Sequence, residues 1–219
     1  MTNFYQQLQT PAVPDLPNPQ DRYDRLTVAQ TNGALRTFFL KLVNSLQSIA
    51  SPRGGRFLNM PYGAFQDTTD QTATANTATV MTFNTTDLSN GVSVVSGSKL
   101  TVAQAGIYNL QFSAQFDNTD TQEHDVSIWL RQDASGAGTD IAGSAGLVGV
   151  PSSHGGISGH VIIGWNYFVT LNTNDFVEIW WSTPNTAVTI QAYAAGTSPT
   201  RPSTASVVAT MTFVSNLSA

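Results

Sequence analysis

Residues 105–116 read Ala-Gly-Ile-Tyr-Asn-Leu-Gln-Phe-Ser-Ala-Gln-Phe, and this stretch decides the fold class. An apolar side chain stands at every second position from Tyr108 to Phe116, and polar Asn, Gln and Ser side chains stand between them. Because successive side chains of a β-strand point to opposite faces, this alternation predicts a strand with one buried and one wetted face.

The same period of two continues downstream. It recurs from Val126 to Leu130 and from Val177 to Trp181, and residues 161–171 form a longer, more apolar candidate strand. Turn signals such as Asn90-Gly91 separate the strands. Further candidate strands are residues 78–84, 92–96, 99–103, 187–194 and 205–215. Roughly eight to ten short strands, with no second helical pattern between them, predict an all-β sandwich or barrel.

Two stretches are predicted to be loops. Residues 117–125 are acidic, and residues 134–159 are rich in Gly, Ser and Ala, with room for one short strand near Ile141. Calcium takes oxygen ligands of the kind gathered in the first loop, so we weigh a calcium site there against a solvated acidic loop. Its candidate ligands are Asp117, Asn118, Asp120, Glu123 and Asp125.

The N-terminal quarter follows a different pattern. Prolines at 11, 14, 17 and 19 favour extended backbone, so residues 1–26 are predicted to form an extended anchoring arm. One helix is predicted from Leu26 to Ile49 with Thr27 as its cap, and Pro52 with Gly54-Gly55 ends it. The predicted organisation is therefore an arm (1–26), an amphipathic helix or stalk (27–50), a hinge (51–56) and a β domain (57–219).

The helix has one side with a heptad-like spacing of four and three residues. This seam consists of Val28, Asn32, Leu35, Phe39, Leu42, Leu46 and Ile49. A coiled-coil stalk would bury the seam between copies of the chain. Ala34, Phe38 and Val43 widen the apolar side, which equally fits a helix that packs on the β domain. Both alternatives stay open.

Composition and charge narrow the function. The chain of 219 residues has no cysteine, which excludes disulfides, thiolate zinc sites and cysteine nucleophiles. Its net charge of −5 argues against nucleic acid as a partner. The charge is uneven: residues 1–56 carry +3 and the remainder carries −8, which suggests two surfaces with different partners. No signal peptide and no apolar run of about 20 residues is visible, so we expect a soluble protein without membrane insertion.

No catalytic constellation stands out. The histidines at 124, 154 and 160 lack supporting zinc ligands, and there is no Gly-x-Ser-x-Gly turn around a serine nucleophile. We therefore expect no enzyme activity, catalytic residue, cofactor or metal. The aromatic side chains at 165, 167, 180 and 181 fit a sugar site, but at strand spacing they more often belong to a core or a subunit interface.

Particular motifs carry a family resemblance over roughly residues 60–215. Ala105-Gly-Ile-Tyr-Asn-Leu-Gln-Phe112 resembles the Ala-Gly-x-Tyr-x-Phe strand of C1q/TNF-like jelly rolls, and 171–179 resembles that family's later hairpin. Residues 60–71 and 81–91, after the helix around Leu35–Leu42, resemble virion structural proteins of tailed phages, including cyanophages. The resemblance implies a ten-stranded jelly roll, a homotrimer, and an N-terminal segment that attaches to the particle.

Strand parity then predicts where copies meet. If Val177 and Trp181 face the core, their neighbours on the same strand face outward, and large aromatics would be exposed. The predicted interface residues are Trp129, Phe168, Phe176 and Trp180. The expected function is a trimeric fibre or decoration subunit of the virion, assembled in the host cytoplasm and bound to other virion proteins of head or tail. The alternative is a receptor- or glycan-binding head that contacts the host cell surface.

Overall fold

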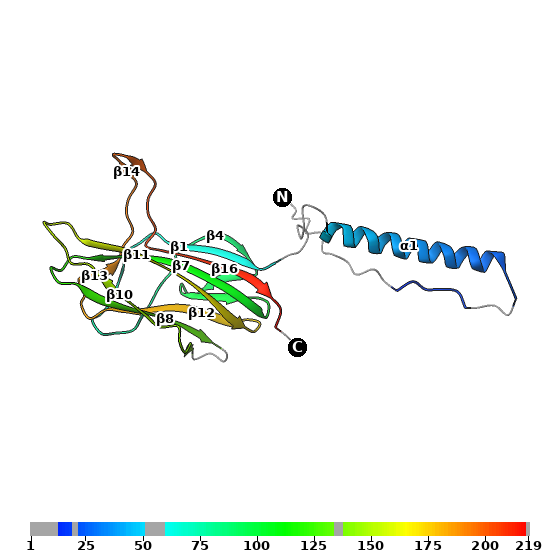
Figure 1. Cartoon of the computed structure of the whole chain (residues 1–219), viewed down its shortest axis with the longest axis horizontal. Helices are drawn as coiled ribbons and strands as arrows, with labels where there is room; N and C mark the ends of the chain where they lie inside the picture. The colour runs from blue at the N-terminus through cyan, green and yellow to red at the C-terminus, as the bar shows by residue number, and fades with distance from the viewer. Residues whose placement is uncertain (1–12, 19–21, 51–59, 134–137, 218–219) are drawn as a thin grey trace. The chain divides into compact units, whose positions relative to one another are not determined.

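The computed structural model describes residues 13–18, 22–50, 60–133 and 138–217. The chain divides into two compact units, Met1–Asn59 and Met60–Ala219 (Figure 1). The predicted hinge at 51–56 and the first residues of the predicted β domain lie outside the described residues. In the part of the chain described, no helix is both long enough and apolar enough to cross a membrane.

The first unit contains helix α1, Arg25–Ala50, within one or two residues of the predicted span. Its cap differs from the prediction. Asp24, not Thr27, accepts the free N–H groups of the first turn, with Oδ1 3.1 Å from Leu26 N and Oδ2 3.0 Å from Thr27 N. The Thr27 hydroxyl donates to the same carboxylate at 2.6 Å. Asp is a strong cap because its short side chain reaches these orphan donors, and the sequence prediction overlooked it.

The second unit is a sandwich of two antiparallel sheets, which confirms the predicted all-β sandwich. In sheet 1 the order is β4 (Thr85–Asn90), β1 (Tyr62–Asp67), β16 (Val207–Ser215), β7 (Gly106–Asn118) and β11 (Gly159–Leu171). Strands β13 (Val188–Ile190) and β2 (Gln71–Thr72) continue from the end of β7 that β16 leaves unpaired.

Sheet 2 lies across the core from sheet 1. Its order is β10 (Gly146–Val150), β8 (His124–Asp133), β12 (Phe176–Ser182), β6 (Lys99–Val102) and β5 (Val92–Val95). Short strands β3 (Thr79–Val80) and β9 (Thr139–Asp140) pair with β12 and β8. A separate two-stranded hairpin, β14 (Gly196–Thr197) and β15 (Thr200–Arg201), stands away from both sheets (Figure 1).

The core is built from the alternating residues that the sequence analysis identified. The apolar positions from Tyr108 to Phe116 are all buried, and Trp181 is fully buried opposite them, with its ring 5.5 Å from that of Phe116. Strand β7 pairs with β11 over its whole length, from Gly106 with Leu171 to Asn118 with Gly159. This long pairing fixes which β11 side chains face the core.

Six strands were not predicted from the sequence. Strands β1, β2, β4, β14 and β15 were not identified, and β10 lies inside the predicted Gly-, Ser- and Ala-rich loop. The reason for the glycine in β10 is visible: a Cβ on Gly146 would clash with the Trp165 ring, so any larger residue would require that ring to shift. The predicted acidic loop is also shorter than expected, because Asp117 and Asn118 belong to β7 and are buried.

Candidate subunit interfaces

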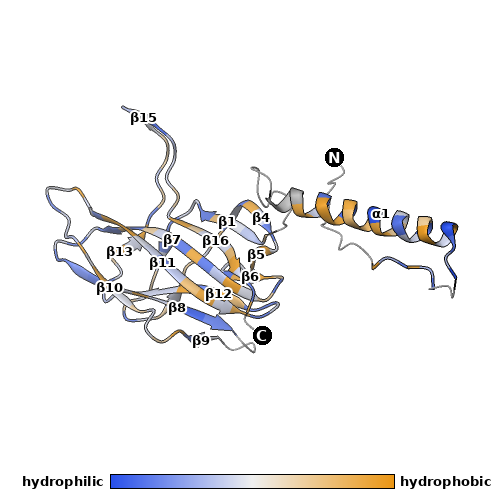
Figure 2. Ribbon diagram, turned by 45° about the vertical axis from the view of Figure 1, so that its right-hand side comes forward, coloured by the Kyte–Doolittle hydropathy of each residue, from blue (hydrophilic) through white to orange (hydrophobic). Residues whose placement is uncertain are grey.

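Apolar residues recur along helix α1, where the ribbon is coloured orange in Figure 2, and several of those on the predicted seam have exposed side chains. Val28, Phe39 and Leu46 are exposed, Leu35 and Leu42 are half-buried, and polar Asn32 is exposed. The side chain of Ile49 lies outside the described residues. An apolar stripe on a helix stabilises the protein only when something covers it. The coiled-coil stalk and the helix packed on the sandwich both remain predictions.

Three of the four predicted interface residues share the outer face of sheet 2. Trp129 and Trp180 are direct cross-strand partners on β8 and β12, and Phe176 lies on the same side of β12. Strand parity therefore predicts correctly which side chains of β8 and β12 face outward. Val177, Ile179 and Trp181 face the core, and the residues between them face outward.

The aromatic rings on this face are already covered or bonded within the chain. The Lys99 ammonium lies 4.1 Å from the centroid of the Phe176 ring, which is only 7% exposed. We expected an outward-facing Phe176 to be exposed, and this lysine explains why it is not. The indole N–H of Trp129 donates to Asp140 Oδ1 at 3.1 Å. That of Trp180 donates to Glu178 Oε2 at the same distance.

The charged side chains of Arg131 and Glu178 on this face are bonded within the chain as well. Arg131 Nε lies 2.8 Å from Asp140 Oδ1, and this hydrogen bond holds the pKa of the Asp140 carboxyl below its usual value. Buried Glu178 accepts a hydrogen bond of 2.7 Å from the Ser98 hydroxyl. A surface whose polar groups are satisfied internally gains little from a second copy, because each contact would first have to be broken.

Phe168, the fourth predicted interface residue, lies on the opposite side of the sandwich. It belongs to β11 of sheet 1, so the four residues do not form one surface. The error has a physical cause: strand parity shows which side of a strand a residue occupies but not which sheet the strand joins. Phe168 is 58% exposed, and Ile162 on the same side of β11 is 69% exposed.

The outer face of sheet 1 is free of charge over strands β1, β16, β7 and β11, and Asp87 of the edge strand β4 borders it with a hydrogen bond of 2.8 Å from Gln66. We define the charge-free face as the outward side chains at alternate positions of 62–66, 107–115, 162–170 and 208–212. These positions hold Thr, Asn, Gln, Ser, Gly, Ala, Val, Ile, Phe and Tyr, and none holds Asp, Glu, Lys, Arg or His. The register aligns them in rows, with Phe168 beside Asn109 and Asn109 beside Thr212.

One end of the charge-free face is closed by a cluster that the sequence analysis missed. The Asp117 carboxylate, 1% exposed, lies 2.9 Å from His160 Nδ1 and 3.3 Å from the Tyr193 hydroxyl. The same hydroxyl lies 3.1 Å from His160 Nδ1. Burial, and then the charge of Asp117, raises the pKa of Tyr193. The sequence contains no signal for this cluster, because Asp117 and His160 become neighbours only through the register of β7 and β11.

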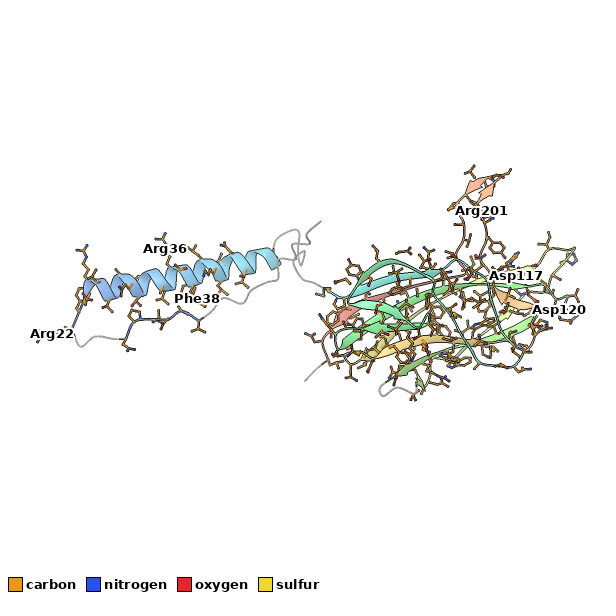
Figure 3. The ribbon with its side chains drawn as sticks, turned by 180° about the vertical axis from the view of Figure 1, so that it is seen from behind. Arg22, Arg36, Phe38, Asp117, Asp120 and Arg201 are labelled. Carbon is orange, nitrogen blue, oxygen red and sulfur yellow. The ribbon has the colours of Figure 1, made fainter. Side chains whose placement is uncertain are left out.

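The candidate calcium ligands have separate partners. Asp117 contacts His160, whereas Asp120 Oδ2 lies 2.8 Å from His124 Nε2 and accepts a hydrogen bond of 2.9 Å from Asn185 (Figure 3 labels both aspartates). The hydrogen bond with His124 lowers the pKa of Asp120. Among the residues described, no three His, Asp or Glu side chains gather in a way that could hold a metal ion.

The four candidate sugar-binding aromatics do not meet either. Trp165 and Tyr167 pack against the core, and Trp181 lies within it. Trp180 projects from the other side of β12, into the charged face of sheet 2.

Comparison with known proteins adds no relative. No protein-family model matches the chain, and no curated protein matches its sequence. The class that the fold defines is an antiparallel all-β sandwich preceded by a helical unit.

Proposed function

We propose that this chain is a non-enzymatic structural subunit of a tailed-phage particle, which forms a homotrimer and attaches through its N-terminal segment. The observation that carries the proposal is the charge-free face. Residues 60–219 carry a net charge of −8, yet the middle strands of sheet 1 present an outer face without charged side chains between Asp87 at the β4 edge and the Asp117–His160 pair at one end, and this face exposes Ile162 and Phe168. Charged residues are depleted where subunits meet, and aromatic ones are enriched.

The order of the strands supports a jelly roll. The chain runs through β1 and β4 in sheet 1 and β5 and β6 in sheet 2. It then crosses to β7, back to β8 and β10, across to β11, back to β12 and finally to β16. Repeated crossing between two packed antiparallel sheets is the connectivity of jelly rolls. It agrees with the C1q/TNF-like resemblance, from which the threefold symmetry is taken.

The energetics favour sheet 1 over sheet 2 as the meeting surface. Full burial of a large apolar side chain such as Phe or Ile contributes about 1.5–3 kcal/mol. Thr, Asn and Gln side chains on the same face can exchange hydrogen bonds across an interface, which offsets the cost of removing them from water. Closed rotational symmetry buries the same face on every copy.

The N-terminal unit has properties that suit attachment to the particle. Its apolar seam and the +3 charge of residues 1–56 contrast with the acidic sandwich. We propose that this unit contacts other virion proteins of head or tail, or its own copies in a stalk. If the basic N-terminal unit binds the particle, the acidic sandwich is free to project from it.

The alternative function, a receptor- or glycan-binding head, has one specific observation in its favour. Trp129 and Trp180 are neighbouring indoles beside Arg131 and Asp140, and a trimer built on sheet 1 leaves this face toward solvent. Aromatic rings beside carboxylates and guanidinium groups are able to stack on and hydrogen-bond to sugars. The Arg131 guanidinium covers Trp180, however, so a ligand would have to displace it.

Deletion of residues 1–59 from the phage gene tests the proposal. We expect particles that lack this protein, while the truncated chain accumulates folded and trimeric in the lysate. Electron microscopy of normal particles would place the protein on the head or the tail. The proposal would be overturned if wild-type particles did not contain the protein and the purified chain were monomeric.

A further inference from the structure

A projecting arm interrupts the chain between β13 and β16. Residues 194–203 leave the sandwich, form the β14–β15 hairpin and return (Figures 1 and 2). The figures show this arm rising on the side of the sandwich where sheet 1 lies. A second copy that meets the charge-free face would therefore lie beside the arm.

The base of the arm is firmly attached to the outer face of sheet 1. Tyr193 and Thr204 exchange backbone hydrogen bonds of 3.0 and 2.8 Å. The Tyr193 hydroxyl contacts Asp117 and His160, and Ala192 N donates to Asp70 Oδ1 at 2.8 Å. The arm therefore leaves the surface at a position fixed by contacts with three other segments, at Asp70, Asp117 and His160.

Beyond its base the arm has little to stabilise it. Most residues from Ala194 to Ser203 are exposed, and each of its two strands is two residues long. An isolated two-stranded hairpin is marginally stable in water at best. An arm with a fixed base and no core of its own is suited to lie against another surface.

Arg201 near the tip indicates the charge of that surface. Residues 60–219 contain three basic side chains, and the other two are engaged: Lys99 lies over Phe176, and Arg131 pairs with Asp140. Within the described part of the chain, the Arg201 guanidinium donates only to the backbone carbonyls of Ala194 and Pro202, at 3.3 and 3.5 Å. Among the described residues, no carboxylate pairs with it.

We propose that the β14–β15 arm is a clasp that lies on the acidic sandwich of a neighbouring copy of this chain, with Arg201 facing one of its carboxylates. The inference rests on the proposed self-assembly and adds a second contact to the charge-free face. The occupant follows from the position of the arm beside that face and from the complementarity between Arg201 and a domain of charge −8.

Site-specific cross-linking of the full chain tests the clasp. The chain has no cysteine, so Thr200→Cys provides a unique attachment point for a maleimide–benzophenone cross-linker beside Arg201. Leu147→Cys, an exposed position in sheet 2, is the matched control. The sample is assembled from a mixture of ¹⁴N- and ¹⁵N-labelled copies. Mass spectrometry then identifies cross-links between copies, because only these join a ¹⁴N peptide to a ¹⁵N peptide.

We expect cross-links between copies from Thr200→Cys, ending in residues 60–217 of the second copy, and few from Leu147→Cys. In a second measurement, Arg201→Glu should raise the concentration at which the assembly dissociates about tenfold, while Arg201→Lys retains most of the affinity. A stable oligomer without cross-links between copies and without an effect of Arg201→Glu would overturn the clasp and leave the proposed function standing. A monomeric wild-type chain would overturn both.

Discussion

The guanidinium carbon of Arg131 lies 4.1 Å from the centroid of the Trp180 ring, and its Nε is bound to Asp140. A cation over an indole contributes roughly 0.5–1 kcal/mol at an exposed site and covers the ring from solvent. Phe168 on the opposite sheet has no such cover. The two outward aromatic rings therefore differ: Trp180 is covered by a side chain of its own chain, whereas Phe168 is exposed and available to a partner.

Phe168→Lys should therefore dissociate the assembly. An unpaired ammonium in the middle of a buried interface costs about 3 kcal/mol or more, which corresponds to at least a hundredfold weaker association. Light scattering at several protein concentrations measures the effect, and circular dichroism should show an unchanged β fold because the side chain is exposed in the single chain.

Trp180→Lys is the control for that experiment. It places the same charge on sheet 2, where we expect the oligomer to persist although the lost packing lowers the melting temperature. The reverse pattern, with dissociation by Trp180→Lys and not by Phe168→Lys, would place the interface on sheet 2. Two monomeric variants would indicate that the substitutions act through folding instead.

Asp24→Ala should unravel the first turn of α1. The carboxylate accepts two backbone N–H groups and the Thr27 hydroxyl, and these hydrogen bonds hold the pKa of Asp24 below its usual value. A lowered pKa means that the cap is intact above the ordinary pKa of Asp and is lost as the pH falls through the lower folded-state value. Helical signal at 222 nm should fall in Asp24→Ala and be largely retained in Asp24→Asn, whose amide oxygen still accepts. Equal signals in both variants would argue against the cap.

Local pattern was sufficient to predict the core. The alternation from Tyr108 to Phe116 depends only on strand geometry, and each apolar residue in it is buried. The helix could be predicted equally well, because its apolar residues recur at a regular spacing over a long stretch. Its cap was misassigned by three residues, since Asp24 and Thr27 are both good cap residues and the pattern alone does not rank them.

Features that depend on pairing were out of reach. Whether β11 joins the sheet of β7 or that of β12 decides which side of the molecule carries Phe168, and no local pattern encodes it. The cluster of Asp117, His160 and Tyr193 combines three segments far apart in the chain. Gly146 looked like a loop residue because the Trp165 ring, which a larger residue would displace, is on another strand.

Residues 60–219 should fold without the rest of the chain. The contacts of the protein separate at Asn59, and the sandwich has a continuous core of its own. A domain of this length buries roughly 70% of its unfolded surface, which is enough for independent stability. We expect a β-type circular dichroism spectrum and one cooperative thermal transition from the isolated fragment. An insoluble fragment beside a soluble full chain would show that α1 completes the core.

Tyr193 should make the stability of the protein fall at alkaline pH. Burial and the nearby Asp117 charge raise its pKa, so the folded state holds the phenol proton more tightly than the unfolded chain does. The contribution of this proton is fully present below the ordinary tyrosine pKa of about 10 and is lost as the pH rises through the higher folded-state value. Tyr108, whose pKa burial also raises, adds a similar loss. The experiment compares the wild type with Tyr193→Phe, which isolates one residue because Tyr108 is common to both proteins.

Denaturant unfolding at about pH 9 and about pH 11 should show a larger loss of unfolding free energy in the wild type than in Tyr193→Phe. Because Tyr193 also anchors the β14–β15 arm, cross-linking from Thr200→Cys should weaken over the same pH range. Equal losses in the two proteins would mean that the hydroxyl ionises as freely in the folded chain as in the unfolded one, and that Asp117 and His160 do not hold it.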